Sequence, residues 1–262
     1  MNPVNRNRRL LGPALSAVAL PAFALLILAQ PSLAHATPAK GAAKGVTAKK
    51  AESGSSWPTG LDSSMVSNLK HGGYVIFFRH AMTNWNERDV PEADFSNRAL
   101  QRNLSEAGQR EASVIGQSIR VLEIPIEKVL ASPMWRCRDT AQFAFGDYDT
   151  TSLLFWKGPT FREARIKVLS TSPAAGKNLV LIGHQDQLIP IVPGLKRDQL
   201  QEGDALVFQP LGGGKYKAVR QVTPFDWARF AGVEPPVAEP APPKETEPSA
   251  ADSLRGSKAE SN

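Results

Sequence analysis

Short apolar runs that end abruptly in polar residues constrain what this chain can fold into more than any other feature. Residues 74–78 form a run of aromatic and β-branched side chains that leads directly into Arg79 and His80. A second run, residues 178–183, leads into His184 in the same way. Continuous apolar runs of this length are typical of strands buried on both faces, as in the middle of a parallel sheet. We therefore expect a sheet with reactive side chains at its strand ends.

The segments between these runs alternate between helical and extended patterns. Ser105 is placed as the N-cap of a helix that continues to about Arg120, and Pro133 is placed in the first turn of a second helix that reaches Phe145. Further expected elements are a strand over residues 129–131 and a hairpin of residues 205–208 and 216–222. The alternation predicts an α/β fold, a single three-layer domain with a mostly parallel central sheet and helices on both faces.

The polar segment between the first strand and the first helix, residues 82–103, is longer than a structural connection needs. Loops of this length inside compact domains are usually functional or disordered. We expect this loop to cover a pocket at the strand ends.

The two ends of the chain differ in composition from its middle. Residues 1–36 contain three arginines, an apolar stretch and Ala34-His35-Ala36, which indicates a cleavable export signal. Residues 37–56 are mainly Ala, Gly, Lys and Ser, with almost no bulky apolar side chain, and residues 233–262 are rich in Pro, Glu, Ala and Ser. They are predicted to be a disordered linker and a disordered tail. The folded domain is expected over residues 57–232, in a periplasmic or secreted protein that is not stably inserted in a membrane after signal cleavage. Retention of the signal as a membrane anchor is the alternative.

The distribution of charge argues against a nucleic-acid partner. The chain carries a net charge of +6, but the signal and the linker each contribute +3 and the tail contributes −3, so the central domain is left with +3. Nucleic-acid-binding domains show a concentrated basic face. A mildly basic domain is better suited to a small anionic substrate.

The single cysteine, Cys137, cannot form an internal disulfide bond, so stability must come from the hydrophobic core. It follows Arg136, but a cysteine-phosphatase loop would need an arginine six positions later, where the chain has Phe143. We interpret Cys137 as a small buried apolar residue. No His, Cys or carboxylate cluster has metal-ligand spacing, so we expect a metal-independent protein without a cofactor.

The three strand ends would bring two imidazoles and at least two guanidiniums into one crevice, because ligands in open α/β sheets bind at the carboxyl ends of the strands. The contributors are Arg79 and His80, then Arg136 in the segment after the second strand, then His184. Guanidinium groups match phosphoryl oxygens and remain charged at physiological pH. Neighbouring cations favour a neutral, nucleophilic imidazole. This pattern predicts a phosphoryl site in which His80 attacks phosphorus.

These residues resemble the histidine phosphatase superfamily, which is also called phosphoglycerate mutase-like. The motifs that carry the resemblance are Arg79-His80, Leu104-Ser105-Glu106-Ala107-Gly108, residues 132–141 of the form Ser-Pro-x-x-Arg-x-x-x-Thr-Ala, and His184. The resemblance implies that His80 is phosphorylated in an intermediate, that Arg79 and Arg136 hold the phosphate, and that His184 contacts it from the other side.

The residue after the first histidine departs from the family pattern, because Ala81 stands where the family usually has glycine. A backbone conformation available mainly to glycine would be lost here. An exported branch that acts on lipopolysaccharide core heptose phosphate is similar in having Arg-His-Ala. A pseudoenzyme that only binds its ligand is the alternative.

The leaving oxygen needs a proton, so a carboxylic acid should face His80. By the resemblance, Phe161-Arg162-Glu163 matches the Leu-x-Glu segment that commonly carries this acid, and Glu163 is favoured. Asp186 is the rival, although Gln185 separates it from His184. Surface salt bridging is the ordinary alternative for both carboxylates. If neither residue is the acid, the loop offers Glu87, Asp89, Glu92 and Asp94.

These expectations combine into an exported phosphomonoesterase that works through a phosphohistidine on His80. The expected substrate is a small-molecule or glycan- or lipid-linked phosphomonoester, and the oligomeric state is left open. A non-catalytic phosphate-binding protein is the first alternative. A phosphomutase is the second, and export counts against it because mutases need a phosphorylated cofactor that is normally cytoplasmic.

Overall fold

The computed structural model describes residues 57–90 and 94–237. The predicted signal over residues 1–36 and the linker over residues 37–56 lie outside the described residues, as does the tail beyond residue 237. In the part of the chain that is described, no helix is both long and apolar enough to cross a membrane.

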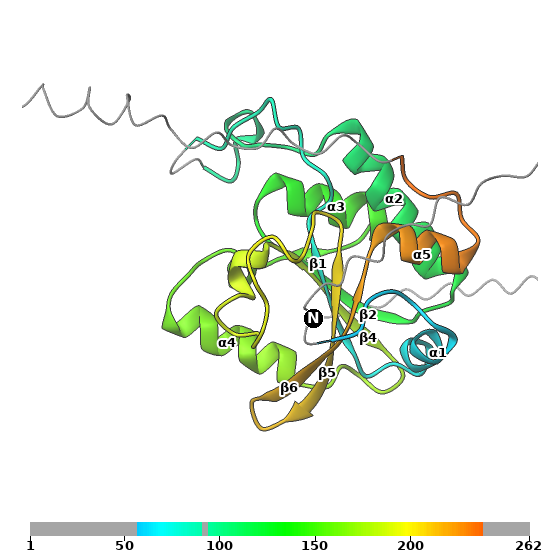
Figure 1. Cartoon of the computed structure of the whole chain (residues 1–262). Helices are drawn as coiled ribbons and strands as arrows, with labels where there is room; N and C mark the ends of the chain where they lie inside the picture. The colour runs from blue at the N-terminus through cyan, green and yellow to red at the C-terminus, as the bar shows by residue number, and fades with distance from the viewer. Residues whose placement is uncertain (1–56, 91–93, 238–262) are drawn as a thin grey trace, which may run out of the picture. The chain divides into compact units, whose positions relative to one another are not determined.

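The centre of the domain is one mixed sheet of six strands in the order β3-β2-β4-β1-β5-β6 (Figure 1). Strands β3, β2, β4 and β1 pair in parallel, whereas β5 is antiparallel to both β1 and β6. The bounds are β1 Val75–Arg79, β2 Ile126–Ala131, β3 Asp149–Thr150, β4 Asn178–Gly183, β5 Ala205–Gly212 and β6 Lys215–Val222. The predicted α/β class with a mostly parallel sheet is confirmed.

Helices cover both faces of this sheet. The bounds are α1 Ser63–His71, α2 Glu106–Val121, α3 Trp135–Phe145, α4 Pro159–Ser170 and α5 Pro224–Ala231, and the short 3₁₀ turns are η1 Arg98–Leu100, η2 Ser152–Leu154 and η3 Gln185–Gln187. The predicted second helix needs a correction at its start. Met134 is the N-cap of α3 and Trp135 its first residue, so Pro133 lies before the helix and not in its first turn.

Alternation along β1 divides the core into two layers. Ile76 and Phe78 pack with α1, α2, α3 and α5, whereas Val75 and Phe77 pack with α4 and the segment after β4. These four side chains are at most 1% exposed. Full burial of a side chain of this size contributes about 1.5–3 kcal/mol to folding. A strand without a polar face therefore has to lie inside the sheet, as the apolar run predicts.

The start of α2 is fitted closely to the loop that leaves the first strand. The Ser105 hydroxyl accepts a hydrogen bond from the Gly108 amide at 3.0 Å, so Ser105 is the N-cap as predicted. A Cβ atom on Gly108 would lie 1.9 Å from the Met82 carbonyl oxygen. Glycine at this position allows the helix to approach the backbone two residues beyond His80.

Candidate active site

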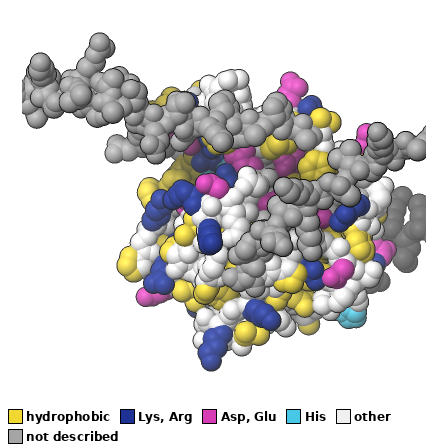
Figure 2. Space-filling view, in the orientation of Figure 1, with side chains coloured by type: hydrophobic (Ala, Val, Ile, Leu, Met, Phe, Trp, Pro, Cys, Tyr) yellow, Lys and Arg dark blue, Asp and Glu magenta, His cyan; other side chains and the backbone are white. Residues whose placement is uncertain are grey.

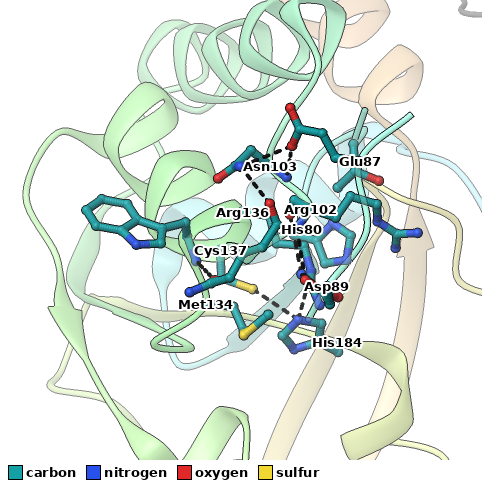
Figure 3. Close-up of polar contacts among 12 residues, drawn as sticks. His80, Glu87, Asp89, Arg102, Asn103, Met134, Arg136, Cys137 and His184 are labelled. Atoms are coloured by element: carbon teal, nitrogen blue, oxygen red, sulfur yellow. Dashed lines mark hydrogen bonds and ion pairs between the residues drawn. The ribbon is translucent and has the colours of Figure 1, made fainter. Parts of the chain in front are cut away.

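The carboxyl ends of β1, β2 and β4 meet at one edge of the sheet, as the sequence predicts. β1 and β4 are parallel neighbours with Arg79 opposite Gly183, so His80 and His184 leave the sheet side by side. Their ring centroids are 5.2 Å apart, with an angle of 64° between the rings. β2 lies on the other side of β4 and leads into α3, whose second residue is Arg136. Figure 3 shows His80, Arg136 and His184 together in this corner.

His80 is held in one tautomer by the backbone. Its Nδ1 lies 3.0 Å from the Ala81 carbonyl oxygen. A carbonyl oxygen can only accept, so Nδ1 carries the proton and donates it. The neutral ring therefore has its lone pair on Nε2. The residue is only 2% exposed, so its packing fixes the ring in this orientation.

The surroundings of His80 favour its neutral form. Burial is the largest cause that holds the pKa of His80 well below its usual range, and repulsion from Arg136, His184 and Arg79 lowers it further. A histidine with this environment keeps its lone pair at neutral and mildly acidic pH. The electrostatics of the corner therefore leave the His80 lone pair unprotonated without a separate base.

Ala81 fits the position where the family has glycine. Its backbone does not have a positive φ, and its side chain is fully buried with Leu104 and Ala112. Its amide donates to the Thr140 hydroxyl at 3.0 Å, and that hydroxyl donates to the Arg136 carbonyl at 2.7 Å. The expected loss of a glycine-only conformation does not arise. Thr140, which the sequence analysis did not assign a role, joins the histidine turn to the helix that carries Arg136.

Arg136 and His184 are directly hydrogen-bonded. The Nε of Arg136 lies 3.2 Å from His184 Nε2, and a guanidinium can only donate, so this imidazole nitrogen is the acceptor. Burial, followed by repulsion from Arg136, holds the pKa of His184 well below its usual range, and the Leu154 backbone partly offsets this effect. Arg136 is 6% exposed. Two of the three predicted phosphate-binding residues, Arg136 and His184, are therefore in direct contact beside His80.

The loop over residues 82–103 reaches the site through Asp89. Its two carboxylate oxygens lie 3.0 and 3.2 Å from Arg136 Nη1, next to the histidines (Figure 3). The Asp89 carboxylate also accepts from the backbone amide of Arg102 at 2.9 Å. A carboxylate that occupies a guanidinium in this way uses the donors that a phosphoryl oxygen would use.

Glu202 is a buried carboxylate of the site that the sequence analysis missed. Its side chain is 9% exposed and lies 3.6 Å from Arg79 and 3.8 Å from Arg102. It also accepts from the Thr83 amide at 2.9 Å and from the Thr83 hydroxyl. Arg79 donates in addition to the Leu200 carbonyl at 2.7 Å. Neither Glu202 nor Arg102 belongs to a recognisable motif, so only the fold reveals that they meet at Arg79.

The structure does not bring the two predicted acids to His80. Glu163 is on the exposed side of α4, and its side chain forms no hydrogen bond or ion pair with the described residues. Asp186 lies in η3 and pairs with Arg197 at 3.4 Å and with Lys157 at 4.0 Å. Their assignment as the acid stays a prediction, and the contacts match the salt-bridging alternative for Asp186.

The four acids that the loop offers have different surroundings. Glu87 accepts from the amide and side chain of Asn103, Asp94 caps the turn at Ser96, and Glu92 lies outside the described residues. Asp89 is the carboxylate of this set that touches a predicted phosphate-binding residue.

Cys137 has the environment of a structural cysteine. It is fully buried, and burial raises the pKa of its thiol to about 12. Its Sγ lies 3.7 Å from His184 Nε2, so it packs under the site as a thiol. Arg138 turns away and stacks on Trp135, with its Cζ 3.7 Å from the ring centroid. No group of three or more potential metal ligands occurs within residues 57–90 and 94–237.

Comparison with protein families gives one match. The family described as histidine phosphatase superfamily (branch 1) matches residues 75–166, a span that includes Arg79, His80 and Arg136 and ends before His184. A comparison with curated protein sequences gave no match.

Several solved structures are similar in fold over most of their own length. A protein histidine phosphatase SixA complexed with tungstate is 17% identical, with a TM-score of 0.44 over 58% of this chain and 97% of that chain. A phosphoserine phosphatase from Entamoeba histolytica, solved as a histidine-to-alanine mutant in complex with phosphoserine, is 15% identical, with a TM-score of 0.39 over 58% and 98%. An alpha-ribazole phosphatase from Shigella flexneri is 14% identical, with a TM-score of 0.39 over 55% and 94%.

Proposed function

We propose that this chain is a phosphomonoesterase that forms a phosphohistidine on His80, because its residues 75–166 match the histidine phosphatase superfamily (branch 1). The observation that carries the proposal is the state of His80 itself. The ring is buried, its Nδ1 is bound to the Ala81 carbonyl, and its pKa is held low by burial and by neighbouring cations. Nε2 is therefore a nucleophile placed among phosphate-binding groups.

The reaction consists of two displacements at phosphorus. The lone pair of His80 Nε2 attacks, the N–P bond forms, and the bond from phosphorus to the ester oxygen breaks. Arg79, Arg136 and His184 hold the phosphoryl oxygens, and fixed donors of this kind stabilise the charge that develops in the transition state. Water then attacks phosphorus, the N–P bond breaks, and inorganic phosphate leaves.

We assign proton transfer to the leaving oxygen to Asp89: its carboxylate, ion-paired in the free protein, takes up the proton of the monoanionic phosphate ester and passes it to that oxygen. An incoming phosphoryl group takes over the Arg136 donors that Asp89 uses in the free protein. The displaced carboxyl group then lies at the mouth of the site, where the ester oxygen departs. Glu163 and Asp186 remain the sequence-based candidates, and their contacts in the structure give no support to either.

Export and the substrate class are proposed on sequence grounds. The Ala34-His35-Ala36 pattern supports export, and Arg79-His80-Ala81 supports the branch that acts on lipopolysaccharide core heptose phosphate. Hydrolysis assays with phosphomonoesters accessible to the periplasm, including heptose phosphates, test this assignment on the purified protein.

The nucleophile is tested by trapping the intermediate. Brief exposure to a phosphodonor followed by an alkaline quench should leave label on the protein that is stable to alkali and labile to acid, as a phosphoramidate is. His80→Ala should abolish the label, whereas His71→Ala should retain it, because His71 is exposed in α1 and its ring bonds to the Ser67 carbonyl. Label that survives His80→Ala, or that is stable to acid, would refute the assignment. Binding of phosphate without label or turnover would support the pseudoenzyme instead.

A further inference from the structure

A second pocket, which the mechanism does not use, lies between the start of α4 and the segment after β4. Its volume is about 420 Å³, which is within the usual range for small-ligand sites. Four basic side chains and a single acidic one line it, namely Lys157, Arg162, Arg165, Arg197 and Asp186. The space-filling view shows Lys and Arg side chains on the left of the molecule, over α4 and the segment after β4 (Figure 2). The pocket therefore has a marked positive potential.

Arg165 is the most informative of these side chains, because it is a buried cation. It is only 4% exposed, and no carboxylate among the described residues lies within ion-pair distance of it. Its Nη1 donates to the carbonyl oxygens of Leu153 and Trp156 at 2.7 and 2.9 Å, but its buried Nε has no hydrogen-bond partner within the part of the chain that the structure describes. Burial lowers the pKa of Arg165. A buried charge without a counterion is costly, and a bound anion would remove that cost.

The N-terminus of α4 opens into the same pocket. Gly158 is its N-cap and supplies no side-chain hydrogen bond, and Pro159 occupies the first turn. Both residues line the pocket. Proline has no amide hydrogen, so the donors for an anion at this end are the amides of Thr160 and Phe161, together with the helix dipole. The N-terminus of α4 and the buried Arg165 guanidinium are independent features, and both favour an anionic ligand.

The remaining cations are exposed and available to a ligand. The side chains of Lys157 and Arg197 are 76% and 71% exposed, and their partner in the pocket is Asp186, at 4.0 and 3.4 Å. One carboxylate cannot balance four cations.

The pocket adjoins the candidate active site without being part of it. Asp186 is two residues from His184, and the backbone that Arg165 holds continues through Phe155, whose ring centroid is 6.3 Å from that of His184.

We propose that this pocket binds a phosphate-class oxyanion, as a subsite separate from the His80 site. The occupant is either a second anionic group of the substrate or free phosphate, and both offer the same oxygens to the helix end and the guanidiniums. The inference goes beyond the proposed function, because binding here requires neither His80 nor turnover.

Equilibrium dialysis of the full chain against labelled inorganic phosphate tests the proposal. The wild type should bind two phosphates per chain. Lys157→Gln/Arg197→Gln should weaken one site at least tenfold, since each charged contact is worth about a factor of ten. Arg136→Ala should instead remove the other site and leave this one. The matched control is Lys215→Gln/Lys217→Gln, which removes the same charge from the exposed β5–β6 hairpin and should leave both sites within about twofold.

One phosphate per wild-type chain, or two that are insensitive to Lys157→Gln/Arg197→Gln, would overturn the proposal even if the protein is an active phosphatase. Two sites with no hydrolysis would keep it and reject the proposed function.

Kinetics then identify the source of the anion. If the anion belongs to the substrate, the double variant raises KM for a hexose bisphosphate about tenfold and leaves that for a hexose monophosphate unchanged. If the anion is free phosphate, the ratio of the two KM values does not change.

Discussion

Replacement of Asp89 by asparagine separates the two roles that the structure gives this carboxylate. In the free protein Asp89 is bound to Arg136, whose side chain is 8% exposed, while its own is 39% exposed. Asparagine at this position would keep the shape of the side chain but lose both the negative charge and the ability to take up and pass on a proton. The variant therefore reports on competition with substrate and on proton delivery at once.

The size of each effect follows from its cause. An ion pair with one partner this exposed is screened by water and is worth about 0.5–1 kcal/mol, so its loss should lower KM about two- to fivefold. Loss of a general acid typically costs about two to four orders of magnitude in rate. This second effect should appear only where the leaving group needs a proton.

The assay compares two substrates on the same protein preparation. With para-nitrophenyl phosphate, whose phenolate leaves without help, Asp89→Asn should lower KM and keep kcat. With glycerol phosphate, an alkyl phosphate, kcat should fall by about a hundredfold or more. Each variant is its own control for misfolding, because global damage would depress both reactions together.

Glu163→Gln and Asp186→Asn are the matched carboxylate variants, and both should retain the alkyl phosphate reaction. A selective loss at Glu163 would refute the assignment of Asp89 and restore the acid favoured from the sequence. A selective loss at Asp186 would assign the acid to that residue, two positions after His184. Equal losses on both substrates for Asp89→Asn, with KM unchanged, would refute both roles of that residue.

Three further outcomes are expected. Arg136→Lys should lose most activity, by about one and a half to three orders of magnitude, because the planar fork and not charge alone fits the phosphoryl group; kcat/KM near wild type would contradict this. Folding keeps His80 neutral, whereas an unfolded imidazole is protonated below about pH 6.5, so this residue lowers the stability of the wild type as the pH falls from about 7 to about 5. His80→Gln should therefore lose less free energy of unfolding than the wild type over this pH range, as measured by urea unfolding. Gly108→Ala should destabilise the domain by about 1–3 kcal/mol in the same assay, although alanine normally favours a helix, because its Cβ meets the Met82 carbonyl.

Local sequence determined much of the fold. The strand predicted over residues 178–183 has the same bounds as β4, and Ser105 caps the start of α2 as predicted. Both features depend on residue type, because burial on both faces selects apolar side chains and capping selects a side-chain hydroxyl. The weaker patterns of α1, α4, α5 and the two-residue β3 were not predicted. These elements are short, and helices of 8–12 residues depend on packing against the sheet for their stability.

The centre of the candidate site also follows from local sequence. Residues that directly follow buried parallel strands must meet at one edge of the sheet, so Arg79, His80 and His184 were predictable without coordinates. The residues that surround them depend on how the whole chain folds. Asp89 and Glu202 come from loops whose paths depend on long-range contacts, and no local pattern states which arginine each carboxylate will reach. Their physical role depends on distance and burial, and both arise only when the chain is folded.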